Sequence, residues 1–186
     1  MAARKAGGLV RCGALVTVIA PEVCAAMAAL GPLTIARRAY APGDAAGYRL
    51  VLTATGIPDV DGAVFADAQA AGVWVNSADD VAHCTFILPS VHRDGPVSVA
   101  VSTGGTSPAL ARWLRARLAE STGPGVGELA DLLGLARRRL HDARRSTETV
   151  DWIALLDGPL PALVRAGERE AARSLVEEAT GVSLSG

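Results

Sequence analysis

The sequence predicts an α/β protein in which a doubly wound parallel sheet is followed by a helical region. Short apolar runs such as residues 15–19 and Leu50–Thr53 are typical of strands that are buried on both faces. Helical stretches separate these runs, and this alternation predicts parallel strands with helices on both sides. After residue 125 the leucines recur at helical spacing, which predicts a helical region at the end of the chain.

The elements of the first part follow one another closely. Helices are expected at residues 2–12, 22–30 and 59–71, and strands at residues 15–19, 33–37, 50–53 and 73–75. Cys12 and Cys24 fall on the first two helices, where we expect both to be buried as small apolar side chains. The cysteines show no paired spacing, which suits a reducing compartment.

A β-hairpin and a helix are expected in the middle of the chain. Val97, Val99 and Val101 alternate with small or polar residues, the pattern of a half-buried strand. Asp94-Gly95 is a turn dipeptide between this strand and the apolar residues 86–88, so these two runs are predicted to pair. Helix 109–120 then follows, with Ser107 as its N-cap and Pro108 at its first position.

A glycine-rich segment leads from this strand into the helix. Backbone N–H groups of glycines before a helix can converge on an outside atom, and the helix dipole adds partial positive charge. The segment could therefore hold carboxylate or phosphate oxygens. The residues concerned are Ser102, Thr103, Gly104, Gly105, Thr106, Ser107 and, on the helix itself, Arg112. A plain strand-to-helix turn with a solvated arginine face is an equally good interpretation.

Two aspartates follow the predicted strand 73–75. Asp79 and Asp80 fall where a parallel strand ends, which is where ligands bind in open α/β sheets, so either could act as a general base. The alternative is an Asx turn or a helix cap. His83, Cys84 and His92 alternate with apolar residues in an expected strand, and their spacing matches no strong metal motif. We therefore predict no resident metal.

The beginning of the chain lacks one feature of a dinucleotide fold. A Rossmann-like domain starts with a strand, a Gly-x-Gly-x-x-Gly turn and a helix, whereas this chain begins inside that helix. We therefore expect that Met1 is not the natural start and that about 20 to 30 residues of strand and glycine turn precede it. A genuine Met1 with a rearranged sheet is the alternative.

Composition excludes several classes of function. The 186 residues carry a formal net charge of −1, which argues against general nucleic-acid binding. No apolar run is long enough to cross a membrane and no signal peptide is visible, so no membrane association and a cytoplasmic location are expected. In the tail, residues 126–145, 152–156 and 171–179 show helical spacing, and Trp152 is expected in the core.

Residues 1 to about 120 resemble the precorrin-2 dehydrogenase and sirohydrochlorin ferrochelatase family, the amino-terminal module of siroheme synthase. Several stretches carry the resemblance. They are residues 3–5, residues 13–21, Arg38-Ala39-Tyr40, the Ala54-Thr55 strand end, Val75-Asn76 with Asp79, residues 86–89 and, above all, residues 102–112. The resemblance implies an NAD-binding Rossmann-like domain at residues 1–87, a dimerisation segment at 88–120 and a helical domain at 121–186. It also implies a homodimer that forms a tetrapyrrole cleft.

The same resemblance implies NAD-dependent oxidation of precorrin-2 to sirohydrochlorin, and transient binding of ferrous iron for its insertion into sirohydrochlorin. Asp79 takes the position of the family's catalytic aspartate. The cofactor would contact Ala20, Pro21, Thr53, Ala54 and Thr55. The substrate would contact Asn76, Arg112 and the glycine-rich segment from Ser102 to Ser107. The family's acidic pair after the Ala-Thr strand end is replaced by Gly56-Ile57-Pro58, and its glycine fingerprint is absent. The alternative is therefore a non-catalytic tetrapyrrole-binding or dimerisation protein that has lost NAD binding.

Overall fold

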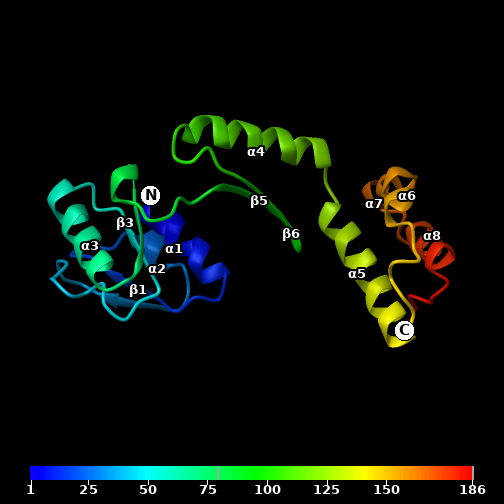
Figure 1. The fold of residues 1–186 in the computed structure, drawn as a ribbon, viewed down its shortest axis with the longest axis horizontal. Helices are drawn as coiled ribbons and strands as arrows, with labels where there is room; N and C mark the ends of the chain where they lie inside the picture. Colours follow the sequence, from blue (N-terminus) through cyan, green and yellow to red (C-terminus); the bar gives the residue numbers. More distant parts are fainter. Residues whose placement is uncertain (79, 186) are drawn as a thin grey trace. The chain divides into compact units, whose positions relative to one another are not determined.

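The computed structural model describes residues 1–78 and 80–185, and the chain forms two compact units, Met1–Leu88 and Pro89–Gly186 (Figure 1). The first unit alternates helices with parallel strands, and the second combines a hairpin with helices. This arrangement confirms the predicted α/β class with a helical C-terminal region.

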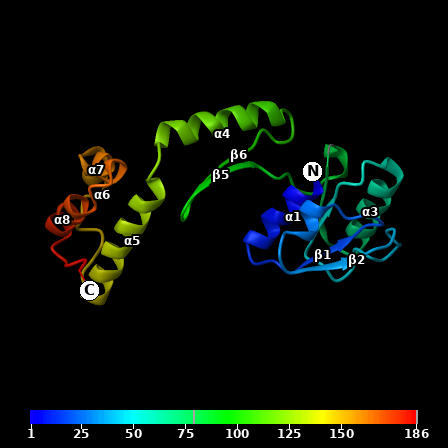
Figure 2. The same cartoon turned by 180° about the vertical axis from the view of Figure 1, so that it is seen from behind.

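The first unit contains two pairs of parallel strands. Its elements are α1 (Ala2–Arg11), β1 (Val16–Ile19), α2 (Ala25–Ala28), β2 (Leu33–Ala36), β3 (Leu50–Thr53), α3 (Pro58–Ala70), β4 (Trp74–Ser77) and the 3₁₀ helix η1 (Val81–His83). β1 lies beside β2 (Figure 2), and β3 pairs with β4 with Leu50 opposite Trp74. Among the described strands, β1 and β3 each have an edge to which no other strand is hydrogen-bonded. Such edges leave backbone groups to solvent.

The core of this unit lies between α3 and the β3–β4 pair. Val75 of β4 and Ala68 of α3 are completely buried, and Phe65 of α3 packs against them. Ala45 and Val73 complete the cluster. The helix therefore covers one face of the strands and brings its first turn to their carboxyl ends, where the predicted ligand-binding residues are found.

Helix α2 is shorter than expected and the cysteines are not buried. The helix was predicted over residues 22–30, but only Ala25–Ala28 are helical, because Cys24 is extended and provides no side-chain cap. Gly31 then turns the chain with a φ of 98°. The prediction that Cys12 and Cys24 are buried is wrong. Each lies at a helix end, beyond the turns that pack against the rest of the unit.

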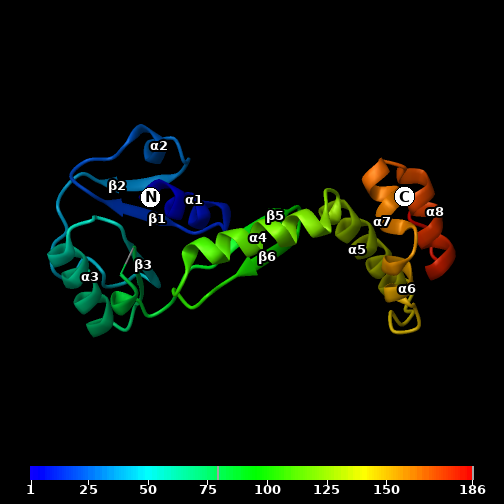
Figure 3. The same cartoon turned by 90° about the horizontal axis from the view of Figure 1, so that it is seen from above.

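The second unit begins with an antiparallel hairpin covered by a helix. Its elements are β5 (Ser90–Asp94), β6 (Val97–Val101), α4 (Pro108–Thr122), α5 (Val126–Asp142), α6 (Trp152–Asp157), α7 (Leu160–Ala166) and α8 (Arg169–Thr180). Helix α4 lies along the hairpin (Figure 3), and both strands contact it. The Asp94-Gly95 turn is confirmed.

The first strand of the hairpin differs from the prediction. It is formed by Ser90–Asp94 rather than by residues 86–88. The reason is that the backbone before Pro89 is bonded to β4 instead. The Thr85 N–H donates to Val75 O at 2.8 Å, and Phe86 O accepts from Asn76 Nδ2 at 2.9 Å. His83 and Cys84 consequently lie outside the strand in which they were expected, and His92 lies within β5.

The N-terminus of α4 and the core of the last helices agree with the predictions from the sequence. Ser107 Oγ accepts from the Leu110 N–H at 3.2 Å and Pro108 opens α4, as predicted. Leu140, Leu160 and Val176 are completely buried at the centre of the last helices, and Trp152 packs against their cluster. Helix α7 was not predicted, because glycines at both its ends interrupt the apolar spacing.

The hairpin turn packs against the start of α5 within this unit. The Gly127 N–H donates to Asp94 Oδ2 at 3.1 Å, so the carboxylate satisfies a donor in the first turn of the helix. A Cβ atom on Gly127 would lie 2.6 Å from Asp94 O, which is too close for any side chain. Glycine at this position is therefore required by the close approach of two backbones.

We expect Gly127→Ala to lower the free energy of unfolding of the second unit by about 1–3 kcal/mol, because the methyl group forces the hairpin turn away from α5. Gly134→Ala on the same helix is the matched control, since its Cβ would meet only the flexible Arg138 side chain at 3.5 Å. That change should stabilise by up to about 1 kcal/mol through helix propensity. Urea unfolding followed by circular dichroism measures both, and equal effects of the two changes would contradict the packing argument.

Candidate functional site

The carboxyl end of β3 is held by a buried aspartate of α3. Thr53 is 4% exposed and Asp61 is 7% exposed, and the Thr53 hydroxyl donates to Asp61 Oδ1. The Thr55 hydroxyl donates to the same oxygen at 2.8 Å. Because both threonines bind one carboxylate, the turn that follows β3 is fixed to the first turn of α3.

This turn and the end of β1 carry the residues that were predicted to contact the cofactor. Ala20 and Pro21 directly follow β1, and the Ala20 N–H still pairs with Ala36 O at 3.2 Å. Gly56 adopts a φ of 71° with open space around its Cα, so the turn after β3 presents backbone to the surface. The open backbone at Gly56 leaves room for a ligand beside this turn. Residues 1–186 contain no Gly-x-Gly-x-x-Gly for the pyrophosphate.

At the end of β4, Asn76 connects three parts of the first unit. The residue is only 5% exposed, and its Oδ1 accepts a hydrogen bond from Lys5 Nζ of α1 at 2.7 Å. Its Nδ2 donates to Phe86 O and to Cys84 Sγ, at 2.9 and 3.4 Å. Asn76 was predicted to contact the substrate, and in the structure its polar atoms hold α1 and the chain after η1 against the strand.

Two aspartates, Asp79 and Asp80, follow β4 in the sequence. Asp79 lies outside the described residues. Asp80 caps η1, since its Oδ1 accepts from the Ala82 N–H at 3.1 Å, which confirms the predicted capping alternative for this residue. Its Oδ2 lies 2.6 Å from His83 Nδ1. The hydrogen bond with His83 lowers the pKa of Asp80.

A second charged network follows β2. Arg38 forms a bidentate pair with Asp44, and the Tyr40 hydroxyl donates to Asp67 Oδ2 of α3 at 2.7 Å. The hydrogen bonds from Arg38 lower the pKa of Asp44 to about 2, and desolvation together with the bond to Asp67 raises the pKa of Tyr40 to about 12. These contacts order the loop between β2 and β3, and both carboxylates are ionised at neutral pH.

Polar groups of the glycine-rich segment in the second unit form hydrogen bonds with one another. Thr103 Oγ1 accepts from the Ser107 N–H and donates to Ser107 O, both at 3.0 Å. The Gly104 N–H donates to Ser102 Oγ at 3.1 Å. Gly104 and Gly105 have φ angles of 61° and 85°, in the left-handed region that favours glycine. Space around Gly104 is open, and Arg112 is exposed on the following helix.

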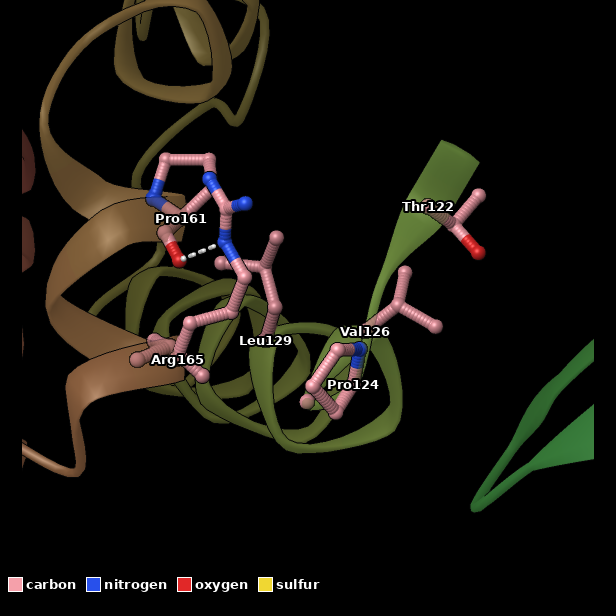
Figure 4. Close-up of a pocket in the computed structure, with 8 residues that line it drawn as sticks. Thr122, Pro124, Val126, Leu129, Pro161 and Arg165 are labelled. Carbon is pink, nitrogen blue, oxygen red and sulfur yellow. Dashed lines mark hydrogen bonds between the residues drawn. The ribbon is translucent and has the colours of Figure 1, made fainter. Parts of the chain in front are cut away.

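Other features of the structure do not form a site. No group of three or more histidine, cysteine or acidic side chains among residues 1–78 and 80–185 is arranged to hold a metal. No helix in the described part of the chain is long and apolar enough to cross a membrane. A small pocket between α5 and α7 is lined by Val126, Leu129 and Arg165, among others (Figure 4). The Arg165 Nε–H donates a hydrogen bond to Pro161 O at 3.1 Å. It lies within the helical unit, whereas the clustered polar residues lie at the strand ends of the first unit.

Sequence reasoning missed the role of Asp61. The signal was present, because Asp61 shares a helical face with Val64 and Ala68 at spacings of three and seven residues, and all three are buried. An acidic residue on an apolar helix face needs a buried partner, and here the partners are the threonines at the end of β3. The contact between Lys5 and Asn76 had no comparable signal.

Two family models and several proteins of known name are similar to this chain. A family of NAD(P)-binding domains matches residues 1–90, and the family of sirohaem biosynthesis central domains matches residues 94–121. The first match supports NAD as the predicted cofactor. Among solved structures, SirC, a precorrin-2 dehydrogenase, aligns with a TM-score of 0.72 over 95% of this chain and 89% of that chain. At 22% identity, this likeness supports the fold.

Curated relatives extend along nearly the whole chain. The siroheme synthase of Pseudomonas putida is 37% identical over 185 residues, which cover 95% of this chain and 39% of that protein. The siroheme synthase of Chromobacterium violaceum is 38% identical over 187 residues, with 96% and 39% covered. That of Nitrosomonas eutropha is 36% identical over 190 residues, with 99% and 40% covered. The chain thus spans about two fifths of the length of these siroheme synthases and is similar to them along nearly all of its own residues, which confirms the predicted resemblance.

Proposed function

We propose that this chain oxidises precorrin-2 to sirohydrochlorin with NAD, in the siroheme biosynthesis of the cytoplasm. The observation that carries the proposal is an NAD(P)-binding family match whose β4 strand is followed in the sequence by Asp79 and Asp80, in a chain that also matches the sirohaem central domain. Carboxyl ends of parallel strands are where such folds bind their ligands. The experiment is to mix the chain with precorrin-2 and NAD and to follow formation of NADH and sirohydrochlorin.

The proposed reaction removes a hydride and a proton from the tetrapyrrole. NAD supplies the hydride acceptor when it is bound, and Ala20, Pro21 and the strand end at Thr53, Ala54 and Thr55 hold its adenosine side. Asp79 accepts the proton, as the family resemblance implies for its position. In the second unit, the segment from Ser102 to Ser107 and Arg112 would bind carboxylates of the substrate, because tetrapyrrole side chains are acidic and arginine binds carboxylates well.

Insertion of ferrous iron into sirohydrochlorin is a second candidate activity. The relatives named siroheme synthase favour it, since siroheme carries iron and the matches cover 95–96% of this chain and 39% of those proteins. Metal insertion requires removal of pyrrole N–H protons, and Asp79 is the carboxylate proposed to accept them. If the chain binds sirohydrochlorin but forms neither NADH nor a metal complex, the non-catalytic tetrapyrrole-binding alternative replaces both proposals.

We expect Asp79→Asn to abolish NADH formation, by at least about a hundredfold, because loss of a positioned proton acceptor typically costs that much. Binding of NAD should be unchanged. Asp131→Asn, an exposed aspartate on α5, serves as the control. Steady-state rates with precorrin-2 measure the effect, and a fully active Asp79→Asn variant would remove Asp79 from the mechanism.

Asp61→Ala should lower the free energy of unfolding by about 1–3 kcal/mol, because it leaves the hydroxyl of Thr53 buried without its acceptor. The same change should weaken NAD binding, since the turn after β3 is then no longer fixed to α3. Asp59→Ala is the matched control, an exposed acid in the same first helical turn. Urea unfolding and NAD calorimetry measure both properties, and a variant as stable and as tightly binding as Asp59→Ala would refute the role of Asp61.

A homodimer is proposed through the hairpin and α4. A two-stranded hairpin is only marginally stable by itself, and here one helix covers it. On α4, Trp113 is 56% exposed and Leu110 is 46% exposed, one helical turn apart, and the Arg117 guanidinium lies 5.5 Å from the Trp113 ring. These exposed apolar side chains are suited to burial against a second copy of the chain.

We expect Trp113→Glu to convert the dimer to a monomer, because a charge would have to be buried at the contact. Leu118→Glu on the same helix is the control, since Leu118 is similarly exposed but lies on a different face. Sedimentation velocity at micromolar concentration distinguishes the two states. A monomeric wild-type chain, or dissociation by Leu118→Glu alone, would contradict this placement of the interface.

A further inference from the structure

The end of α5 carries an exposed cationic surface in the helical unit. Residues 137–145 contain five arginines and one acid, Asp142. Three of the arginines are exposed and are here called the α5 arginine patch: Arg137, Arg138 and Arg144. In the described part of the chain, none of these three side chains forms a salt bridge or a hydrogen bond. Their charges are therefore open to solvent.

The two remaining arginines of this run serve the packing of the unit. Arg145 Nη1 donates to Gly181 O at 2.9 Å, which ties the end of α5 to the turn after α8. Arg139 is half-buried, and its Nε atom is shielded from solvent. The run thus divides into arginines that contact other parts of the fold and the α5 arginine patch, which does not.

The backbone at Arg144 adds a second observation. Its φ is 54°, and among the described residues it alone has a positive φ without being a glycine. The Arg144 N–H donates to His141 O and the Arg145 N–H donates to Leu140 O, both at 2.9 Å, so Arg144 takes the left-handed position that ends a helix. The left-handed residues that end α7 and α8 are glycines. Because glycine would adopt this conformation at lower energy, stability does not explain an arginine here.

The charges of the second unit are separated along the chain. Residues 112–145 carry eight arginines and four acids, a net charge of +4 with histidine neutral. Residues 146–185 carry three arginines and seven acids, a net charge of −4. The glycine-rich segment directly precedes the positive region in the sequence. An anion that approaches this unit is therefore attracted by α4 and α5 and repelled by the helices that follow.

We infer that the α5 arginine patch attracts the carboxylates of the tetrapyrrole substrate and raises the rate at which that substrate binds. Charge complementarity identifies the occupant, because tetrapyrrole side chains are acidic and the patch is cationic without acidic partners. Such a patch acts during the encounter, so it changes the association rate more than the lifetime of the complex. The inference rests on the proposed dehydrogenase function.

A purely structural role of the same arginines predicts different behaviour. Cations in the last turn of a helix interact favourably with the helix dipole, and that effect changes the stability of the fold. Attraction of a charged ligand instead changes the association rate, and salt weakens it. The Debye length falls from about 30 Å at 0.01 M ionic strength to about 10 Å at 0.1 M.

The first test is stopped-flow binding of sirohydrochlorin to the full chain. At 0.01 M ionic strength, Arg137→Gln combined with Arg138→Gln should lower the association rate constant by at least about threefold, with the dissociation rate unchanged. The difference from the wild type should vanish at 0.5 M salt. Arg137→Lys combined with Arg138→Lys keeps both charges and should keep the rate.

A matched control changes the net charge equally at another place. Arg11 ends α1 and Arg49 directly precedes β3, and both are exposed in the first unit, away from the carboxyl ends of its strands. Arg11→Gln combined with Arg49→Gln should bind sirohydrochlorin at nearly the wild-type rate. An equal slowing of both double variants would mean that net charge alone matters, which overturns the role of the patch.

The second test uses Arg144→Gly, for which stability and binding should change in opposite directions. Urea unfolding should show a higher midpoint than the wild type, because glycine relieves the left-handed backbone. The association rate constant for sirohydrochlorin at 0.01 M ionic strength should fall, because one charge of the patch is lost. A lower midpoint, or an unchanged association rate, would contradict the assignment of Arg144 to the patch.

The outcomes separate the inference from the function on which it rests. A wild-type chain that binds sirohydrochlorin at a rate independent of salt overturns the inference alone. Slow association of the double lysine variant also overturns it, since the arginines would then act through specific contacts rather than charge. A wild-type chain that does not bind the tetrapyrrole overturns the proposed function, and the inference with it.

Discussion

The candidate site depends on buried polar side chains that hold the carboxyl ends of β3 and β4. Asp61 binds the hydroxyls of Thr53 and Thr55, and Asn76 binds Lys5 and the backbone at Phe86. Each of these groups would be costly to bury alone, and each is satisfied by a partner from another element. The turns after both strands are therefore fixed in place. The positions of Asp80, which caps η1, and of the His83 imidazole depend on these contacts.

A different constraint shapes the second unit, where glycines permit close backbone approach. Gly127 allows the hairpin turn to contact the start of α5, and Gly104 with Gly105 turns the chain from β6 towards α4. The hydroxyls of Ser102 and Thr103 are used to hold that turn. Any anion that binds there would therefore meet open space and backbone at Gly104 rather than these side chains. The preformed turn lowers the cost of ordering the segment around a ligand.

Local sequence signals predicted the regular elements well and the long-range contacts poorly. Strand Leu50–Thr53, the cap at Ser107 and the turn at Asp94-Gly95 follow from nearest-neighbour chemistry, and all three are present. The strand expected at residues 86–88 is absent, because Asn76 and Val75 bind that backbone from ten residues earlier. Such competition between two partners for one segment cannot be read from periodicity.

In the candidate site, too, some features follow from neighbouring residues in the sequence and others from tertiary packing. Asp80 lies at the predicted strand end, and its capping role follows from its place before a short helix. The pairing of β1 with β2 and of β3 with β4, by contrast, is set by tertiary packing. Exposure of Cys12 and Cys24 also depends on what covers the helix ends. Residue type alone predicted burial for both cysteines, and neither helix end is covered.

The central claim is that the first unit binds NAD at the carboxyl ends of its parallel strands. Isothermal titration calorimetry of this chain with NAD tests that claim most directly, because it needs neither the tetrapyrrole nor turnover. The account predicts saturable binding of about one NAD per chain. Absence of binding would contradict the dehydrogenase assignment and favour a protein that binds tetrapyrroles without oxidising them.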